Sequence, residues 1–332
     1  MGREERLELI KKIQEIRQSK VICYITGDRE NVSTRIAPDV VRIFYRHLEN
    51  LQPCERLDLF LYTRGGDVLT PWRLVNLFRE YASYFSVLVP FRAYSAGTLI
   101  ALGANEIVMG KMGELGPIDP SVANAFNPQD PNNPAAKIPV SVEDVSSFIT
   151  LAVETCQLKG QEQLESVFSH LAEKVHPLAL GNVQRNYSLI RSIARKLLRL
   201  HMSADDEDLI KDIINNLTEK LYAHNHMISR REAKQDIKLP VVNSSTELEK
   251  AMWELYEDFE NELNLLEPFN PAALVNEHQK KVDFEVYGGI IESFAGMDCF
   301  TFSGTAVAVE ILPDGTPNVN INMKKQSWKR II

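Results

Sequence analysis

The sequence predicts an α/β protein with a parallel sheet of stacked β-α units, a helical middle region, and a C-terminal helix followed by a β-hairpin. Short apolar runs alternate with helical patterns over the first third of the chain. These runs are almost continuously apolar, which is typical of parallel strands that helices cover on both faces. Near the end of the chain an Asp-Gly pair separates two strand-like runs, which is typical of a hairpin turn.

Each element of the first third follows from this alternation. Apolar runs predict strands at Val21–Ile25, Leu57–Tyr62, Ser86–Phe91 and Glu106–Met109. Apolar residues at helical spacing predict helices over residues 37–49, about 70–84 and Ala96–Leu102. The charged N-terminal stretch also has a helical period, and Arg92–Ser95 is expected to form a turn.

The rest of the chain divides into three stretches. Residues 113–139 are rich in Pro and Asn and are expected to form a long loop: a lid, a substrate-binding segment or a plain surface insertion. Residues 141–236 read as mostly helical, with a clear amphipathic stripe over 189–198. We expect further helices at about 206–223 and 246–264, a hairpin of Thr305–Leu312 with Val319–Met323, and two domains, a catalytic one over 1–240 and an extension over 241–332 that could serve oligomerisation.

Composition excludes several classes of protein. The chain has 332 residues and a net charge of -8, whereas a non-specific nucleic-acid binder needs clustered Lys and Arg. We find neither a signal peptide nor a run of about 18 apolar residues that could span a membrane. Four scattered cysteines show neither zinc spacing nor a Cys-x-x-Cys pair. We therefore expect a cytoplasmic protein that binds neither membrane nor nucleic acid.

Two segments carry residues suited to catalysis. Thr63–Val68 follows one expected strand with Gly65 and Gly66 adjacent, and Ala93–Thr98 follows the next with Ser95 before a helix. Parallel strands bring such segments to the same edge of a sheet, where sites form. Paired glycines let the backbone approach a ligand and point N–H groups at it. A serine facing backbone donors is what acyl transfer requires, although such a serine can also simply cap a helix.

The order of four motifs resembles the superfamily of the Clp protease proteolytic subunit, signal peptide peptidase A and the crotonases. The motifs are Thr-Arg-Gly-Gly-Asp-Val at 63–68, Tyr-Ser-Ala-Gly-Thr at 94–98, Ala-Leu-Gly-Ala-Asn-Glu-Ile-Val-Met at 101–109 and Leu-Gly-Pro-Ile-Asp-Pro at 115–120. Together with the stretches at 176–183 and 224–233, they are most similar to the family called serine dehydrogenase proteinases. The resemblance spans roughly residues 20–240 and implies a Clp-protease/crotonase-like sheet.

The resemblance implies hydrolysis of peptide bonds without a cofactor. Ser95 matches the nucleophile of the superfamily, Gly65 and Gly66 match its oxyanion loop, and the Ala96 amide would complete the oxyanion hole. The resemblance also implies self-assembly, a polypeptide substrate and, as one option, a partner protein that delivers it. Where the Clp branch keeps a catalytic His, this chain has Ile118.

Because that position holds no histidine, we choose candidates for the general base by the chemistry of the available side chains. His176 is the first candidate, because a neutral imidazole needs little tuning to accept a proton near pH 7; it could also be only part of a helix-entry turn before Pro177. Lys174 and Lys137 are alternatives that would have to lose a proton by desolvation, and His224 lies in a motif that resembles the segment near the triad acid.

Asp119 could orient a base or serve only as a turn residue, and Asp67 could be no more than a helix cap. His224 and His226 lack a nearby third ligand, so no metal is expected. Two alternatives to a peptidase stay open: a crotonase-like enzyme acting on thioesters, and an inactive ring-forming scaffold.

Overall fold

A large twisted sheet organises the chain in a computed structural model that describes residues 2–118, 121–122, 126–130, 133, 136–138, 140–218, 226–276, 279–311 and 317–332. Over these residues the sheet has eight strands in the order β10-β5-β3-β2-β1-β11-β12-β13. Five of them are parallel: β1 (Lys20–Thr26), β2 (Cys54–Tyr62), β3 (Ala82–Val89), β5 (Glu106–Met109) and β10 (Val241–Asn243). The α/β fold with a parallel sheet is confirmed.

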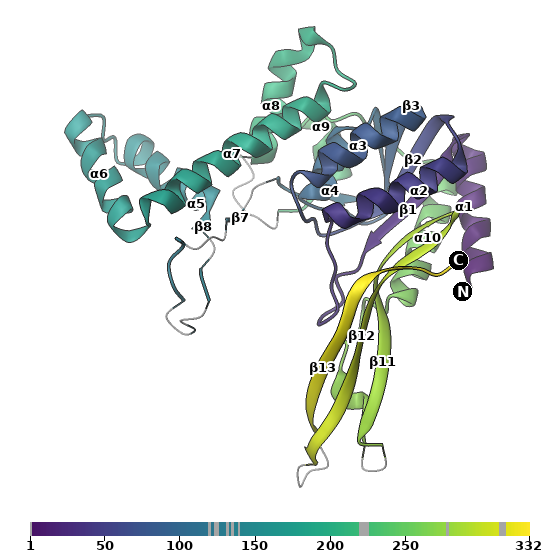
Figure 1. Cartoon of the computed structure of the whole chain (residues 1–332). Helices are drawn as coiled ribbons and strands as arrows, with labels where there is room; N and C mark the ends of the chain where they lie inside the picture. Colours follow the sequence, from purple (N-terminus) through teal and green to yellow (C-terminus); the bar gives the residue numbers. More distant parts are fainter. Residues whose placement is uncertain are drawn as a thin grey trace.

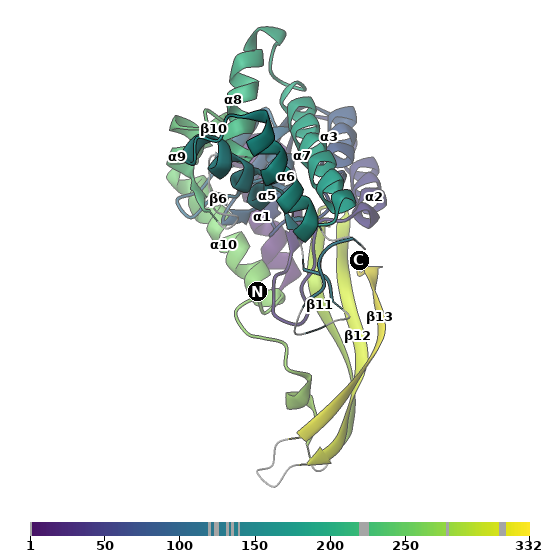
Figure 2. The same ribbon diagram turned by 90° about the vertical axis from the view of Figure 1, so that its left-hand side faces the viewer.

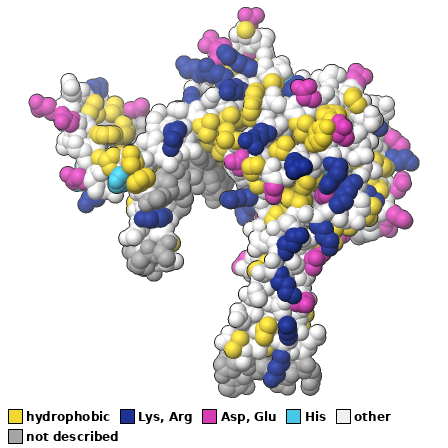
Figure 3. Space-filling model, in the orientation of Figure 1, with side chains coloured by type: hydrophobic (Ala, Val, Ile, Leu, Met, Phe, Trp, Pro, Cys, Tyr) yellow, Lys and Arg dark blue, Asp and Glu magenta, His cyan; other side chains and the backbone are white. Residues whose placement is uncertain are grey.

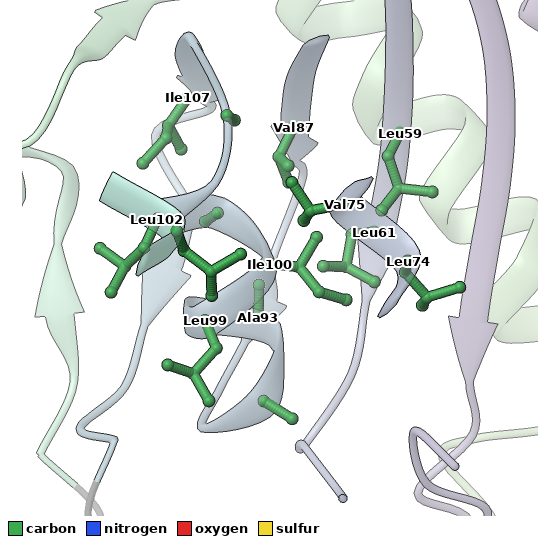
Figure 4. Close-up of a cluster of buried hydrophobic side chains, with 14 of the residues drawn as sticks. Leu59, Leu61, Leu74, Val75, Val87, Ala93, Leu99, Ile100, Leu102 and Ile107 are labelled. Carbon is green, nitrogen blue, oxygen red and sulfur yellow. The ribbon is translucent and has the colours of Figure 1, made fainter. Parts of the chain in front are cut away.

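Helices cover both faces of the parallel part (Figure 1). One face carries α2 (Val41–Leu51), α3 (Thr70–Tyr81), α4 (Ala96–Leu102), α7 (Pro177–Leu198) and α8 (Glu207–Thr218); the other carries α1 (Arg3–Arg17) and α10 (Thr246–Glu262). Side chains alternate between two cores: Leu59 and Leu61 of β2 face α4, whereas Phe60 faces α10. Figure 4 shows side chains of the core on the α4 side of the sheet packing around α4. This packing holds the helix that follows Ser95 in place.

Most expected elements of the first third are confirmed, and α4 and β5 match at both ends. Arg92–Ser95 is the exception, because Arg92–Ala93 is a short strand, β4, and not part of a turn. β4 pairs with β6 (Glu114–Leu115), which pairs in turn with β9 (Ile228–Ser229). Two-residue strands with distant partners leave no pattern in the sequence, since their pairing is set by tertiary context.

The helical middle region is confirmed and forms an arm. Figure 1 shows α5 (Val142–Thr150), α6 (Gln161–Lys174) and the first turns of α7 projecting from the sheet and its covering helices. The helix expected at 206–223 is seen as α8 up to Thr218, and its remaining residues lie outside the described ranges. Within 113–139, the described residues include β7 (Ser121–Val122), which pairs with β8 (Val140–Ser141).

The end of the chain forms a second projection, a three-stranded antiparallel arm (Figure 2). The expected hairpin is confirmed as β12 (Gly296–Ile311) and β13 (Pro317–Arg330), and β11 (Lys281–Ser293) adds a third strand that also pairs with β1. The division at residue 240 stays a prediction, although β10 and β11 both extend the sheet of the first part. Among the described helices, none is both long and apolar enough to cross a membrane; the cytoplasmic location stays a prediction.

A buried ionic cluster ties the N-terminal helix to the C-terminal part. Arg6 of α1 is fully buried and donates from Nη1 to Asp258 of α10 and from Nε to Glu292 of β11, both at 2.6 Å. Burial raises the pKa of Glu292, against the opposing effect of the guanidinium of Arg6. Arg6 therefore offsets part of the cost of burying both carboxylates, and Arg3 adds a second cation 3.0 Å from Glu292.

We expect Arg6→Met to lower the free energy of unfolding by about 3–5 kcal/mol, because it removes the buried cation that bridges Asp258 and Glu292. Urea denaturation measures this change. Lys12→Met is the matched control on the same helix, since the partly exposed Lys12 forms only a long, 3.8 Å ion pair with exposed Glu247; it should change stability by less than about 0.5 kcal/mol. A loss below about 1 kcal/mol for Arg6→Met would contradict the role of the cluster.

Candidate active site

The two segments singled out in the sequence lie side by side at the carboxyl edge of the parallel strands. The residues after β2 and those around β4 run parallel, with Thr63 bridged to Ala93. Thr63 N–H donates to the Arg92 carbonyl at 2.9 Å, and Tyr94 N–H donates to the Thr63 carbonyl at 3.0 Å. This pairing brings the glycine pair against the turn that carries Ser95.

Ser95 sits in a strained turn between β4 and α4. Its backbone has φ 52° and ψ −109°, a conformation that residues other than glycine rarely adopt. Such strain costs on the order of 1–3 kcal/mol and tends to concentrate at functional sites. A sharp strand-to-helix turn with this geometry is also how hydrolases expose a nucleophilic serine. The side chain is half-buried and does not cap α4, so the structure gives it no capping role.

The backbone of Gly65 lies in close contact with Ser95. A Cβ built on Gly65 would lie 2.7 Å from the Ser95 Cβ and 3.2 Å from its Oγ, and φ at Gly65 is +113°. Any side chain at position 65 would therefore displace Ser95. The Gly65 N–H donates to Thr63 Oγ1 at 3.0 Å, so this amide already has an acceptor.

Gly66 presents its amide differently. The Gly65 carbonyl accepts from Ile36 N–H at 2.9 Å, so it points toward Ile36. In a trans peptide the C=O and the following N–H point in opposite directions, so the Gly66 N–H points away from Ile36. Ala96 is the first residue of α4, and the N–H groups of a first helical turn have no intrahelical acceptor. Within the described residues, the amides of Gly66 and Ala96 both lack an acceptor.

Three residues of the two motifs, to which sequence reasoning assigned no role, hold this arrangement. Thr98 Oγ1 lies 2.9 Å from the Ala93 carbonyl and 2.8 Å from that of Gly116, so it ties β4 to the chain after β6. Thr63 Oγ1 receives the Thr26 hydroxyl at 2.7 Å besides the amide of Gly65. Gly97 lets α4 approach β2, because a Cβ there would lie 2.5 Å from the Thr63 methyl group. Threonines and a glycine in such places give no signal apart from the contacts themselves.

Tyr94, next to Ser95, is held as a neutral phenol. Its hydroxyl donates to Glu114, which also lies 3.6 Å from Arg92. Burial and the hydrogen bond to Glu114 raise the pKa of Tyr94 to about 12. A phenol that keeps its proton near neutral pH cannot act as the general base for Ser95.

The base candidates do not meet Ser95 within the described chain. His176 caps α7 through a 3.2 Å hydrogen bond from Leu178 N–H to Nδ1, and its ring stacks on Phe126. Lys174 ends α6, and Lys137 is exposed. No side chain of the described residues hydrogen-bonds to Ser95 Oγ. Candidates His224 and Asp119 lie outside the described residues, so their roles stay predictions.

The structure also places Ile118, Asp67 and His226. Ile118, where the Clp branch keeps its His, is buried in the core. Asp67 caps α3, as its Oδ2 accepts from Thr70 N–H at 2.7 Å. His226 lies 2.9 Å from Glu232, and the described residues contain no group of three or more His, Cys, Asp or Glu side chains that could hold a metal.

A Ser-His-Asp chain of hydrogen bonds exists elsewhere in the fold. His47 Nδ1 lies 2.7 Å from Ser293 Oγ, and its Nε2 lies 3.0 Å from Asp298 Oδ2. All three side chains are fully buried between α2 and the β11–β12 turn, so no substrate can reach them. Burial lowers the pKa of His47 below its usual value, and nearby Arg330 and Arg46 act in the same direction against the raising effect of Asp298.

The lowered pKa of buried His47 predicts that the folded protein loses stability in mild acid. The unfolded chain takes up a proton at His47 near pH 6.5, whereas the folded chain stays neutral there, so stability is lost as pH falls below about 6.5. We expect His47→Gln to flatten the dependence of unfolding free energy on pH between 5 and 7, by up to about 1.4 kcal/mol per pH unit. Urea denaturation across this range measures it. His201, whose pKa is also lowered by burial, should supply the slope that remains; an unchanged slope in His47→Gln would contradict the expectation.

Fold and site together define an α/β protein of the Clp-protease type, with a serine turn set against a glycine loop. Comparison with known families agrees: the profile of the ClpP-like SDH-type serine proteinases matches residues 2–176. The chain belongs to that family.

Two relatives are uncharacterized proteins of Methanocaldococcus jannaschii. MJ0137 is 28% identical over 201 residues, which cover 60% of this chain and 58% of the relative. MJ1495 is 28% identical over 182 residues, which cover 51% of this chain and 59% of the relative. The chain thus spans less than two thirds of the length of either relative.

Proposed function

We propose that this protein is a serine peptidase that hydrolyses polypeptides through Ser95. In the proposed reaction, Ser95 Oγ attacks the scissile carbonyl and a base takes its proton. The acyl-enzyme forms as the amine leaves, and water then releases the acid. Membership of a serine proteinase family supports the proposal. No cofactor enters this chemistry.

The observation that carries the proposal is the pair of free amides beside a strained serine. We propose that the Gly66 and Ala96 N–H groups bind the oxyanion, because neither has an acceptor within the described chain. The Gly65 amide is already used by Thr63, so we assign Gly65 to close approach and not to donation. The sequence predicted an oxyanion hole formed by Gly65, Gly66 and Ala96. We propose that only the amides of Gly66 and Ala96 act as donors.

A comparison of substrate classes tests the proposal. The purified chain should release fragments from an unfolded protein such as reduced casein and should hydrolyse an activated ester, with both activities lost in Ser95→Ala. A crotonase-like enzyme would instead turn over a coenzyme A thioester and would depend less on the serine. Thioester turnover that survives Ser95→Ala, without peptide hydrolysis, would overturn the proposal; so would the absence of all three activities, which an inactive scaffold predicts.

His176 remains our first candidate for the base, with Lys174, His224 and Lys137 as alternatives. α7 has 22 residues and is about 33 Å long, and its C-terminal half packs against the core of α4 while His176 lies at its other end. We therefore propose that His176 serves Ser95 of another copy.

Mixing two inactive variants tests whether His176 of one copy serves Ser95 of another. His176→Ala alone should lose about 10²–10⁴-fold in kcat, Ser95→Ala alone should be inactive, and their mixture should regain activity. His170→Ala, which alters an exposed histidine of α6, is the control and should stay active. If the mixture stays as inactive as its components, the base does not come from His176 of another copy.

A further inference from the structure

The outermost strand of the β-arm has a free edge. β13 pairs with β12 along its length, and no other described residue pairs with it on the far side. Figures 1 and 2 both show it as the outer strand of an arm that projects away from the body. An open edge presents unpaired N–H and C=O groups that can pair with another strand.

Part of this edge lacks the charges that usually protect one. Figure 3 shows Lys and Arg side chains spaced along the arm, with hydrophobic patches near its outer end. The lysines of β13 begin at Lys324, so the stretch Asn318–Met323 carries no charge. Ile321 is 44% exposed and Met323 40% exposed, although both are large and apolar. We call Val319–Met323 the edge segment.

The edge segment has two distinct faces. Its three apolar residues, Val319, Ile321 and Met323, pair across the strands with Ala308, Ala306 and Gly304. They therefore extend the apolar side of the arm, where Phe284 and Phe302 pack. Asn320 and Asn322 pair with Val307 and Thr305 and point to the opposite side. The order is apolar, Asn, apolar, Asn, apolar, which reads the same in both directions about Ile321.

We propose that the edge segment pairs with the same segment of a second copy of this chain, antiparallel about a two-fold axis at Ile321. A two-fold interface uses the same patch on both copies, so it requires a self-complementary sequence. In this register Val319 faces the partner's Met323 and Asn320 faces the partner's Asn322. On the axis, Ile321 of one copy faces Ile321 of the other. The arms then join into one continuous sheet with a continuous apolar face.

Charge fixes the register. With the axis at Ile321, Lys324 faces the partner's Asn318, so no lysine meets another. Moving the axis by one residue to Asn322 places Asn320 opposite the partner's Lys324 and Val319 opposite the partner's Lys325, which removes the apolar pairs. Moving it to Lys324 or Lys325 sets like charges opposite each other, which is destabilising.

Cysteine cross-linking tests the register. In a Cys54→Ser, Cys156→Ser background, only the buried Cys23 and Cys299 remain. Directly opposite residues have Cβ atoms about 4.5–5.5 Å apart, within reach of a disulfide after small adjustment. Ile321→Cys should therefore link two copies under mild oxidation. Val319→Cys alone and Met323→Cys alone should not, whereas a mixture of these two variants should.

Val309→Cys is the matched control. Val309 is 68% exposed on β12 of the same arm, but two copies of it would lie more than about 14 Å apart, since three strand spacings separate them and they are also offset along the strands. Linking of Ile321→Cys no faster than that of Val309→Cys would overturn the proposal, and so would linking of Val319→Cys with itself. Capture of an unrelated extended polypeptide by the edge would leave Ile321→Cys unlinked and would also overturn it.

Light scattering provides a second readout that does not depend on activity. Ile321→Lys should halve the particle mass relative to the unmodified chain, because it places two cations on the axis. Circular dichroism confirms that the variant is folded. An unchanged mass would contradict the pairing even if the protein is an active peptidase, so this inference and the proposed function can fail separately.

Discussion

Ser95→Ala should abolish peptide hydrolysis, with kcat falling by roughly 10⁴–10⁶-fold. The reason is that the nucleophile is lost while the amides of Gly66 and Ala96 remain to support a small residual rate. Binding should be little affected, because the change removes only one oxygen. The expected result is therefore a loss in kcat with KM nearly unchanged, measured with a fluorogenic peptide.

Ser83→Ala is the matched control for this change. Ser83 is exposed near the opposite end of β3, where its hydroxyl contacts the Glu55 carbonyl at 3.3 Å. It should keep full activity. A loss of less than about tenfold in Ser95→Ala would place the nucleophile elsewhere.

Gly65→Ala should lower kcat by about 10²–10³-fold although it removes no catalytic group. The added methyl group would lie 2.7 Å from the Ser95 Cβ, so either the serine turn or the glycine loop has to move. φ of +113° adds strain for any side chain, which should also lower the free energy of unfolding by about 1–3 kcal/mol. Peptide hydrolysis and urea denaturation measure the two effects on one sample.

Gly181→Ala is the control for the general effect of replacing a glycine by alanine. Gly181 lies within α7, and a Cβ there would meet nothing within 4 Å. The change should keep activity and stabilise the chain by about 0.5–1 kcal/mol. If Gly65→Ala behaves like Gly181→Ala, the close approach of Gly65 to Ser95 does not matter to catalysis.

The sequence predicted the elements whose cause is local. β5 and α4 matched at both ends because apolar periodicity and flanking turn residues determine them directly. The two site segments could be placed at one sheet edge because parallel strands leave no other arrangement. The same reasoning could not tell the amide of Gly65 from that of Gly66, since the difference depends on the Thr63 hydroxyl and on Ile36.

Other features depend on contacts between distant residues and could not be predicted. β4 and β6 are two residues long, and β9 pairs with β6 from more than a hundred residues away. The buried cluster around Arg6 joins residues 6, 258 and 292. His176 shows the limit most clearly: the sequence allowed both a base and a residue of a helix-entry turn before Pro177, and the structure shows that it caps a helix of the projecting arm.

Covalent labelling with a fluorophosphonate, followed by mass spectrometry of the peptides, tests the role of Ser95 most directly. The strained turn and the free amides predict a single phosphonylated residue, Ser95, with labelling lost in Ser95→Ala and kept in Ser83→Ala. Labelling of the active protein at a different residue, or active protein that is never labelled, would contradict the assignment of Ser95 as the nucleophile.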